Sequence, residues 1–251
     1  MKWSMKALVT AATVVAFAAA APAAHAVSPV VALRGNAWLS KVRGSSVTPA
    51  KFHVVTTFST DTPGAPLFTL QRAVIFFPDH AGTNGQLFAS CSAKQIASFR
   101  GNVQRCPRGS KIGSGTVTAQ VHELGITATG RVTMFNSQRG KSIAFNIRTL
   151  LPAYINETIE APLTQLHGRY GEKLALVVPP TLQEVLSGVF VGVQDFDVTI
   201  TGIAHVGGAD YSYLKARTCP TTALHGVFDF IDGGTGQPAG ATVDTRVQCR
   251  A

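Results

Sequence analysis

Two aspartates come nearest, by type and spacing, to catalytic or metal-binding chemistry. Asp195 and Asp197 alternate with Phe196, Val198 and Ile200, the two-residue period of a β-strand, so both carboxylates should lie on one face. The strand rise predicts a separation of roughly 6 to 7 Å, which is compatible with Ca²⁺ ligation or with glycoside hydrolysis. Such alternation is more typical of the solvent-facing side of a sheet. We therefore keep the pair as weak calcium candidates and as the basis of an alternative function, an extracytoplasmic hydrolase.

Motifs for other catalytic chemistry are missing from the sequence. There is no G-x-S-x-G turn to present a nucleophilic serine and no H-E-x-x-H metal motif. The histidines are scattered without the spacing of metal ligands. We therefore predict a protein that is not an enzyme, with no catalytic residues and no cofactor.

Four cysteines, Cys91, Cys106, Cys219 and Cys249, are spaced too widely for the two close pairs of a zinc cluster. Three disulfide connectivities are possible, and the local patterns favour the sequential one. Cys91 and Cys106 bracket a short helical segment, residues 93–100. Cys219 and Cys249 flank a predicted hairpin whose tip lies near Gly234. We expect two structural disulfides, formed in an oxidising compartment.

The first 26 residues have the order of a secretory signal peptide. Lys2 and Lys6 precede an apolar run over residues 7–21, and the small-residue motif Ala24-His25-Ala26 follows. The run is too short to span a bilayer, which takes roughly 20 apolar residues. We predict a signal peptide over 1–26, a single domain over 27–251, no membrane span, and a secreted or envelope-associated location.

The remaining chain is predicted to consist of about nine to eleven short strands. Residues 74–77 and 174–178 are unbroken apolar runs typical of strands covered on both faces, whereas residues 142–148 and 195–201 alternate. Helical signals are confined to residues 93–100 and 181–187. This pattern predicts an all-β fold, a two-sheet antiparallel β-sandwich with one or two short helices and two disulfides, with a barrel as the alternative.

The charge is unevenly distributed. The formal net charge of +9 becomes +7 when Lys2 and Lys6 leave with the leader. Residues 94–148 hold nine bases and one acid, Glu123. A basic face of this kind favours an anionic cell-envelope polymer as a partner. The candidate residues are Arg100, Arg105, Arg108, Lys111, Arg131, Arg139, Lys141 and Arg148.

Two other ligand classes have weaker support in the sequence. Single-stranded nucleic acid binding needs aromatic platforms among the bases, and residues 94–148 hold only three phenylalanines, so no nucleic acid partner is predicted. A carbohydrate-binding protein is a further alternative, because Tyr211 and Tyr213 are two residues apart and should share a strand face. Sheet packing is the simpler interpretation of that pair.

The chain resembles a group of exported actinobacterial proteins of no assigned function. The resemblance covers roughly residues 74–249. Its motifs are Cys106-Pro107-x-x-Ser110-x-Ile112-Gly113-x-Gly115, after the cysteine-flanked insert, and Cys219-Pro220 with Cys249 in the last strand. It implies a secreted, disulfide-linked β protein and carries no activity or site residues. Together with the charge, it predicts a secreted binding or structural protein without catalytic function.

Overall fold

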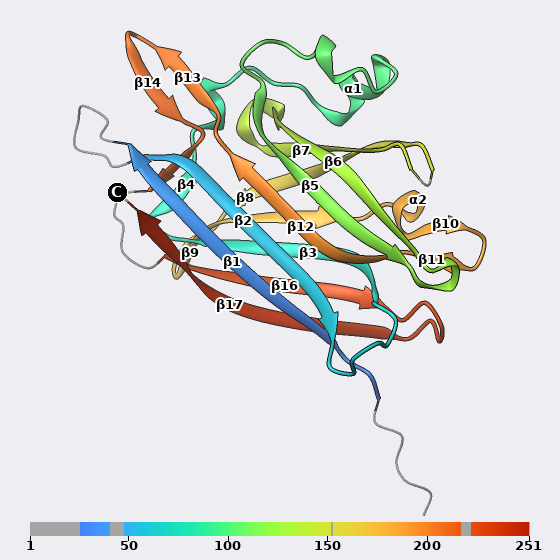
Figure 1. The fold of residues 1–251 in the computed structure, drawn as a ribbon. Coiled ribbons are helices and arrows are strands. Elements are labelled where there is room, and N and C mark those ends of the chain that lie inside the picture. The colour runs from blue at the N-terminus through green and yellow to red at the C-terminus, as the bar shows by residue number, and fades with distance from the viewer. Residues whose placement is uncertain (1–25, 41–47, 152, 217–221, 251) are drawn as a thin grey trace, which may run out of the picture.

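The structure, a computed structural model, describes residues 26–40, 48–151, 153–216 and 222–250. Most of this chain forms β-strands, and the two α-helices are short (Figure 1). In chain order the elements are β1 (Pro29–Ser40), β2 (Thr48–Thr60), β3 (Thr69–Pro78), β4 (Ala81–Thr83), α1 (Ala93–Ser98), β5 (Lys111–Val121), β6 (Ile126–Ser137), β7 (Ser142–Thr149), β8 (Ile155–Gln165), β9 (Tyr170–Val177), α2 (Pro180–Gln183), β10 (Glu184–Leu186), β11 (Val189–Phe190), β12 (Gly192–Ile200), β13 (Ile203–Val206), β14 (Ala209–Ser212), β15 (Leu214–Ala216), β16 (Thr222–Ile231) and β17 (Pro238–Arg250).

Eleven strands close into a barrel in the order β1-β17-β16-β3-β9-β8-β7-β6-β5-β12-β2. The predicted two-sheet sandwich is therefore wrong. The barrel closes where β1 pairs in parallel with β17, from Asn36 opposite Gln248 to Trp38 opposite Arg250. Every other pairing in the barrel is antiparallel. Closure pairs the backbone groups that a sandwich would leave along its edge strands.

Side chains alternate between the barrel interior and its outer surface. Ile143, Phe145 and Ile147 of β7 point inward, as the alternation predicted. The run 174–178 is a strand as expected, but it is not covered on both faces: Leu174 and Leu176 point inward, while Val177 is 60 % exposed. The interior is apolar because one residue in two along each strand is apolar.

The insert between β4 and β5 packs on the outer surface of β6 and β7. It carries the predicted disulfide, Cys91–Cys106, and the predicted helix α1, which Ser92 and Gln95 cap reciprocally. Ile96 of the helix is fully buried with Phe135 and Ala144, which point outward from the barrel. Asn136 of β6 holds the part of the insert that precedes the helix. Its side-chain Nδ2 donates to the carbonyl oxygens of Gly85, Phe88 and Ala89 at 3.0 to 3.2 Å.

Three other local predictions can be compared with the structure. The hairpin with its tip near Gly234 is confirmed as β16 and β17. The helix expected over residues 181–187 is only the single turn α2, because the chain becomes extended at Glu184 and forms β10. Cys219 lies outside the described residues, and so does its expected disulfide with Cys249. No helix in the described chain is long and apolar enough to cross a membrane.

Candidate functional site

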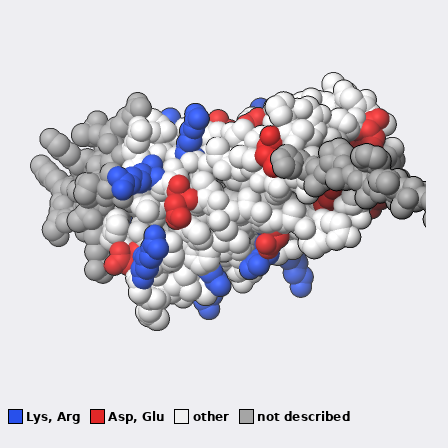
Figure 2. Space-filling view, turned by 90° about the horizontal axis from the view of Figure 1, so that it is seen from below, with Lys and Arg blue, Asp and Glu red and all other residues white. Residues whose placement is uncertain are grey.

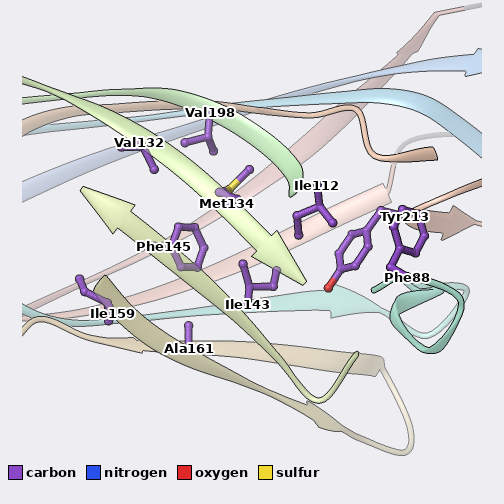
Figure 3. Packing of buried hydrophobic residues seen from close by; sticks show 10 residues of the cluster. All are labelled: Phe88, Ile112, Val132, Met134, Ile143, Phe145, Ile159, Ala161, Val198 and Tyr213. Carbon is purple, nitrogen blue, oxygen red and sulfur yellow. The ribbon is translucent and has the colours of Figure 1, made fainter. Parts of the chain in front are cut away.

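The barrel encloses a cavity of about 430 Å³. All eleven barrel strands except β1 and β17 contribute lining residues, and these are overwhelmingly apolar. Figure 3 shows part of the wall close to one end of the barrel: Val132, Met134 and Val198 lie on one side and Ile143, Phe145 and Ile159 on the other, all pointing into the interior. The rest of the lining belongs chiefly to β2, β3, β9 and the segment from α2 to β11.

This space is much larger than an ordinary packing gap. Protein cores pack as tightly as organic crystals and contain few voids larger than a water molecule. A cavity lined by aliphatic and aromatic side chains also offers water too few hydrogen-bonding partners to hold it. The geometry and chemistry of the interior therefore suit an apolar molecule.

One end of the barrel, hereafter the buried end, is covered by the small sheet of β4 and β15. Tyr213 precedes β15, is fully buried and packs edge-on against Phe88, with 5.2 Å between ring centroids. Its backbone is held on both sides: Asn84 N donates to Tyr213 O at 2.7 Å, and Tyr213 N donates to Gly202 O at 2.8 Å. The Tyr213 hydroxyl points into the barrel toward Ile112 and Ile143 (Figure 3), and no described group pairs with it.

Glu172 of β9 is the charged residue of the buried end. It shares the inward face of β9 with Leu174 and Leu176 and is 1 % exposed. Gln165 Nε2 donates to its Oε1 at 2.6 Å, and Thr83 Oγ1 donates to the same oxygen at 3.5 Å. Its Oε2 has no partner in the described chain. Burial raises the pKa of Glu172 from its usual 4.5 to about 7, against the lowering effects of Lys215 and of these two hydrogen bonds.

At the other end, hereafter the mouth, the cavity wall reaches the surface. Leu124 and Leu186 line the cavity yet are 49 % and 62 % exposed. The mouth is formed by the β5–β6 hairpin, the β7–β8 loop and the segment from α2 to β11, at the right of Figure 1. Leu150, Leu151 and Tyr154 of the β7–β8 loop add further exposed apolar surface. A small molecule can therefore reach the interior from this end.

On the side toward the mouth, β8 and β9 are neighbours in the barrel but are not paired by backbone hydrogen bonds. The two strands pair only from Leu163 opposite Leu174 to Gln165 opposite Glu172. The rest of β8, which begins at Ile155, pairs with β7 alone. The barrel wall is therefore less fully hydrogen-bonded near the mouth than at the buried end, so this is the part of the wall best able to widen.

The predicted acidic pair lies outside the barrel, not in the cavity. Asp195 and Asp197 share the outer face of β12 as expected, while Phe196 and Val198 line the cavity. Asp197 Oδ1 contacts His53 Nε2 of β2 at 2.8 Å, and both side chains are partly exposed. Across the described chain, no three His, Cys, Asp or Glu side chains gather as a metal site would require.

The eight basic candidates are all exposed, and the structure separates them into two groups. Arg131 and Arg148 are direct cross-strand neighbours on β6 and β7. The other six lie at the opposite end of these strands, in the insert, at the start of β5 and at the β6–β7 turn: Arg100, Arg105, Arg108, Lys111, Arg139 and Lys141. None of the eight forms an ion pair with a described residue.

Acids adjoin this basic side in space although they are distant in sequence. Glu160 of β8 lies beside the insert, because its Oε2 accepts from Ala93 N at the start of α1 and its Oε1 accepts from Ser142 Oγ. On the face shown in Figure 2, Lys, Arg, Asp and Glu are scattered singly among uncharged residues. The basic side of residues 94–148 therefore includes an acid, Glu160, that the local sequence does not contain.

The predicted tyrosine pair does not form a platform. Tyr211 ends up exposed on β14, whereas Tyr213 lies beyond the end of that strand and is fully buried. Sequence reasoning also missed Glu172 as a site residue. The sequence did contain a signal for it. Glu172 is two residues from Leu174 and four from Leu176, and the alternation of a strand places all three side chains on one face, so a carboxylate lies on an otherwise apolar face.

Comparison with known proteins adds no relative: no protein-family model, no curated protein and no solved structure matches this chain.

Proposed function

We propose that this protein binds an apolar molecule, or the hydrocarbon chain of an amphiphile, inside its barrel. The observation that carries the proposal is the apolar cavity of about 430 Å³ with its mouth at one end. Its volume falls in the range of small-molecule sites, roughly 300 to 1,000 Å³. Smaller barrels of eight strands already hold one small ligand, and the interior widens with strand number.

The energetics favour a hydrocarbon chain of moderate length. Burial of apolar surface contributes about 0.8 kcal/mol per methylene group, so a chain of about ten gains ~8 kcal/mol. Immobilising the ligand opposes this gain. Because the wall is apolar almost throughout, selectivity for chain length should come from the volume of the cavity.

The predicted export belongs to the same proposal. The Cys91–Cys106 disulfide supports an oxidising compartment, and the leader is the feature that would direct the chain there. A non-catalytic carrier outside the cytoplasm would keep an apolar molecule soluble between membranes or envelope layers.

Binding of a neutral apolar probe should stabilise the fold measurably. Residues 27–251, titrated with the fluorescent amine N-phenyl-1-naphthylamine, should show saturable binding that 1-decanol displaces. At a ligand concentration of about 100 times Kd, the stability gain is ~2.7 kcal/mol, which corresponds to a rise in Tm of roughly 5 to 10 °C. A linear, non-saturating fluorescence signal with an unchanged Tm would mean that the interior does not accept ligands.

A second candidate function is contact with an anionic envelope polymer through the basic side. The observation in its favour is that all eight candidate bases are exposed and lack ion pairs in the described chain.

Retention of the protein on isolated anionic cell walls should fall as salt rises from about 0.05 to 0.5 M, because screening weakens exposed charge contacts. The double change Arg139→Gln with Lys141→Gln should lower retention, and Arg34→Gln on β1 is the matched control. Salt-independent retention would exclude the contact.

A further inference from the structure

Exposed apolar side chains concentrate on the rim of the mouth. The four most exposed large hydrophobic side chains of the described chain are Leu150, Leu151 and Tyr154 of the β7–β8 loop and Leu186 of β10. Leu124, between β5 and β6, is a fifth on the same rim. Single exposed apolar residues scattered over a surface are normal, whereas a group of them around one opening is typical of a surface that contacts a protein or a membrane.

This apolar rim is continuous with the cavity. Leu124 and Leu186 line the cavity and are also exposed, and Ala153 of the β7–β8 loop lines it beside the exposed Leu150 and Leu151. A ligand that leaves through the mouth therefore meets the rim first. A surface that supplies or accepts an apolar ligand has to cover this rim, because the ligand otherwise crosses water.

Two arginines lie together on the outer face of the barrel near the rim. Arg131 of β6 is directly opposite Arg148 of β7, and like charges in this position destabilise a strand pair. Their partners on the flanking strands are uncharged, Thr116 of β5 and Asn156 of β8. Neither arginine has an ion pair in the described chain. Two adjacent guanidinium groups of this kind suit a phosphate, which accepts several N–H donors at once.

Arg148 connects this pair to the rim. Its guanidinium carbon lies 5.9 Å from the centre of the Tyr154 ring, and Leu150 follows it by two residues. Two residues of extended chain span roughly 6 to 7 Å. That length matches the depth of ~5 to 10 Å to which apolar side chains enter a lipid surface. Leucines at the tip, with an aromatic ring and a basic group behind them, form a typical membrane-interface arrangement.

The acids of the rim determine which side of the mouth approaches an anionic surface. Glu123 and Glu184 are exposed on the β5–β6 hairpin and the segment from α2 to β11, and both would be repelled. Residues 150–154 of the β7–β8 loop carry no charge. Glu157 of β8 is opposite the inward-facing Ile147, so it lies on the other face of the strand from the arginines. The β7–β8 side therefore makes the closest approach.

We propose that the mouth docks on an anionic phospholipid surface, with Leu150 and Leu151 inserted at the edge of the acyl chains and Arg131 and Arg148 on head-group phosphates. This inference rests on the proposed binding of an apolar ligand in the barrel. In the docked position the mouth opens toward the lipid tails, so the ligand passes between the acyl region and the cavity without crossing water.

Vesicle flotation tests the insertion of the leucines. Residues 27–251 are mixed with vesicles of phosphatidylcholine that contain about one third phosphatidylglycerol. The double change Leu150→Ser with Leu151→Ser should weaken vesicle binding at least about tenfold, because it removes most of the apolar surface that enters the lipid. The matched control is Ile203→Ser with Val206→Ser, which are exposed on β13 at the buried end and should bind vesicles as the parent does.

A second pair of variants tests the phosphate contacts. Arg131→Gln with Arg148→Gln should weaken binding to the phosphatidylglycerol vesicles by about tenfold or more, since each base near an anionic surface strengthens binding about fivefold. Binding to pure phosphatidylcholine vesicles should not change. Arg139→Gln with Lys141→Gln removes two bases at the other end of these strands and should have no effect on either kind of vesicle.

Probe binding without vesicles separates docking from ligand binding. Leu150 and Leu151 do not line the cavity, so displacement of N-phenyl-1-naphthylamine by 1-decanol should be the same in the leucine variant and the parent. Saturable probe binding without vesicle binding, or equal vesicle binding by all variants, would overturn the docking and leave the proposed function intact. A dimer that the leucine changes dissociate, in place of vesicle binding, would assign the rim to a second copy of the chain and also overturn it. Vesicle binding without probe binding would instead remove the proposed function.

Discussion

Ala128→Phe should lower the affinity for an apolar ligand by at least about tenfold. Ala128 of β6 lies opposite Ala119 of β5, and both small side chains line the cavity. A phenyl ring at this position projects into the space that the ligand occupies, so binding must displace it or lose contacts. A tenfold loss corresponds to only about 1.4 kcal/mol, less than the burial energy of two methylene groups.

The neighbouring residue provides a matched control. Thr129 is on the same strand, but its side chain is exposed on the outer surface. Thr129→Phe should therefore leave ligand affinity unchanged. Ala128→Phe should also unfold at an equal or higher temperature than the parent protein, because a ring that fills apolar space adds burial. If both variants bind the probe as the parent does, the ligand does not enter the barrel.

The strands that sequence analysis located are those with strong alternation. In β7 and β12, three successive inward positions hold large apolar residues, so the period of two is clear: Ile143, Phe145 and Ile147 in β7, and Phe196, Val198 and Ile200 in β12. The first strand was missed for the opposite reason. Its inward positions include Leu33, Gly35 and Ala37, all buried, and two of these three are too small to give a hydrophobic signal.

Closure of the barrel could not be predicted from local patterns. It depends on the parallel pairing of β1 with β17, strands from opposite ends of the chain, and hairpin signals report only on sequence neighbours. The same limitation applies to the cavity. Alternation tells which face of a strand is apolar, but the volume left between facing walls depends on strand number and stagger.

The candidate site was predictable in part. The spacing of Glu172 from Leu174 and Leu176 indicated a carboxylate on the inward face of β9. No local pattern indicated that β14 would end at Ser212 and that the side chain of Tyr213 would turn into the barrel. That turn depends on Asn84, whose backbone N and side-chain Nδ2 bond the carbonyl oxygens of Tyr213 and Ser212. Asn84 is more than 120 residues away in sequence from both.

Glu172→Gln should abolish a loss of stability that the parent protein undergoes between about pH 4.5 and pH 7. The folded-state pKa of Glu172 is raised to about 7, whereas the unfolded value is 4.5. Between these values the folded protein holds a proton that the unfolded chain has released. The free energy of unfolding therefore falls as pH rises through this window and levels off above pH 7.

The size of the effect follows from the shift in pKa. Each unit is worth about 1.4 kcal/mol, so ionising the buried carboxyl costs on the order of 3 kcal/mol, or roughly 10 °C in Tm. Urea unfolding of the parent and of Glu172→Gln from pH 4 to pH 8 measures it, since all other titrating groups are common to both proteins. The variant should gain stability relative to the parent as pH rises. Parallel stability curves would show that Glu172 is hydrated in the folded state.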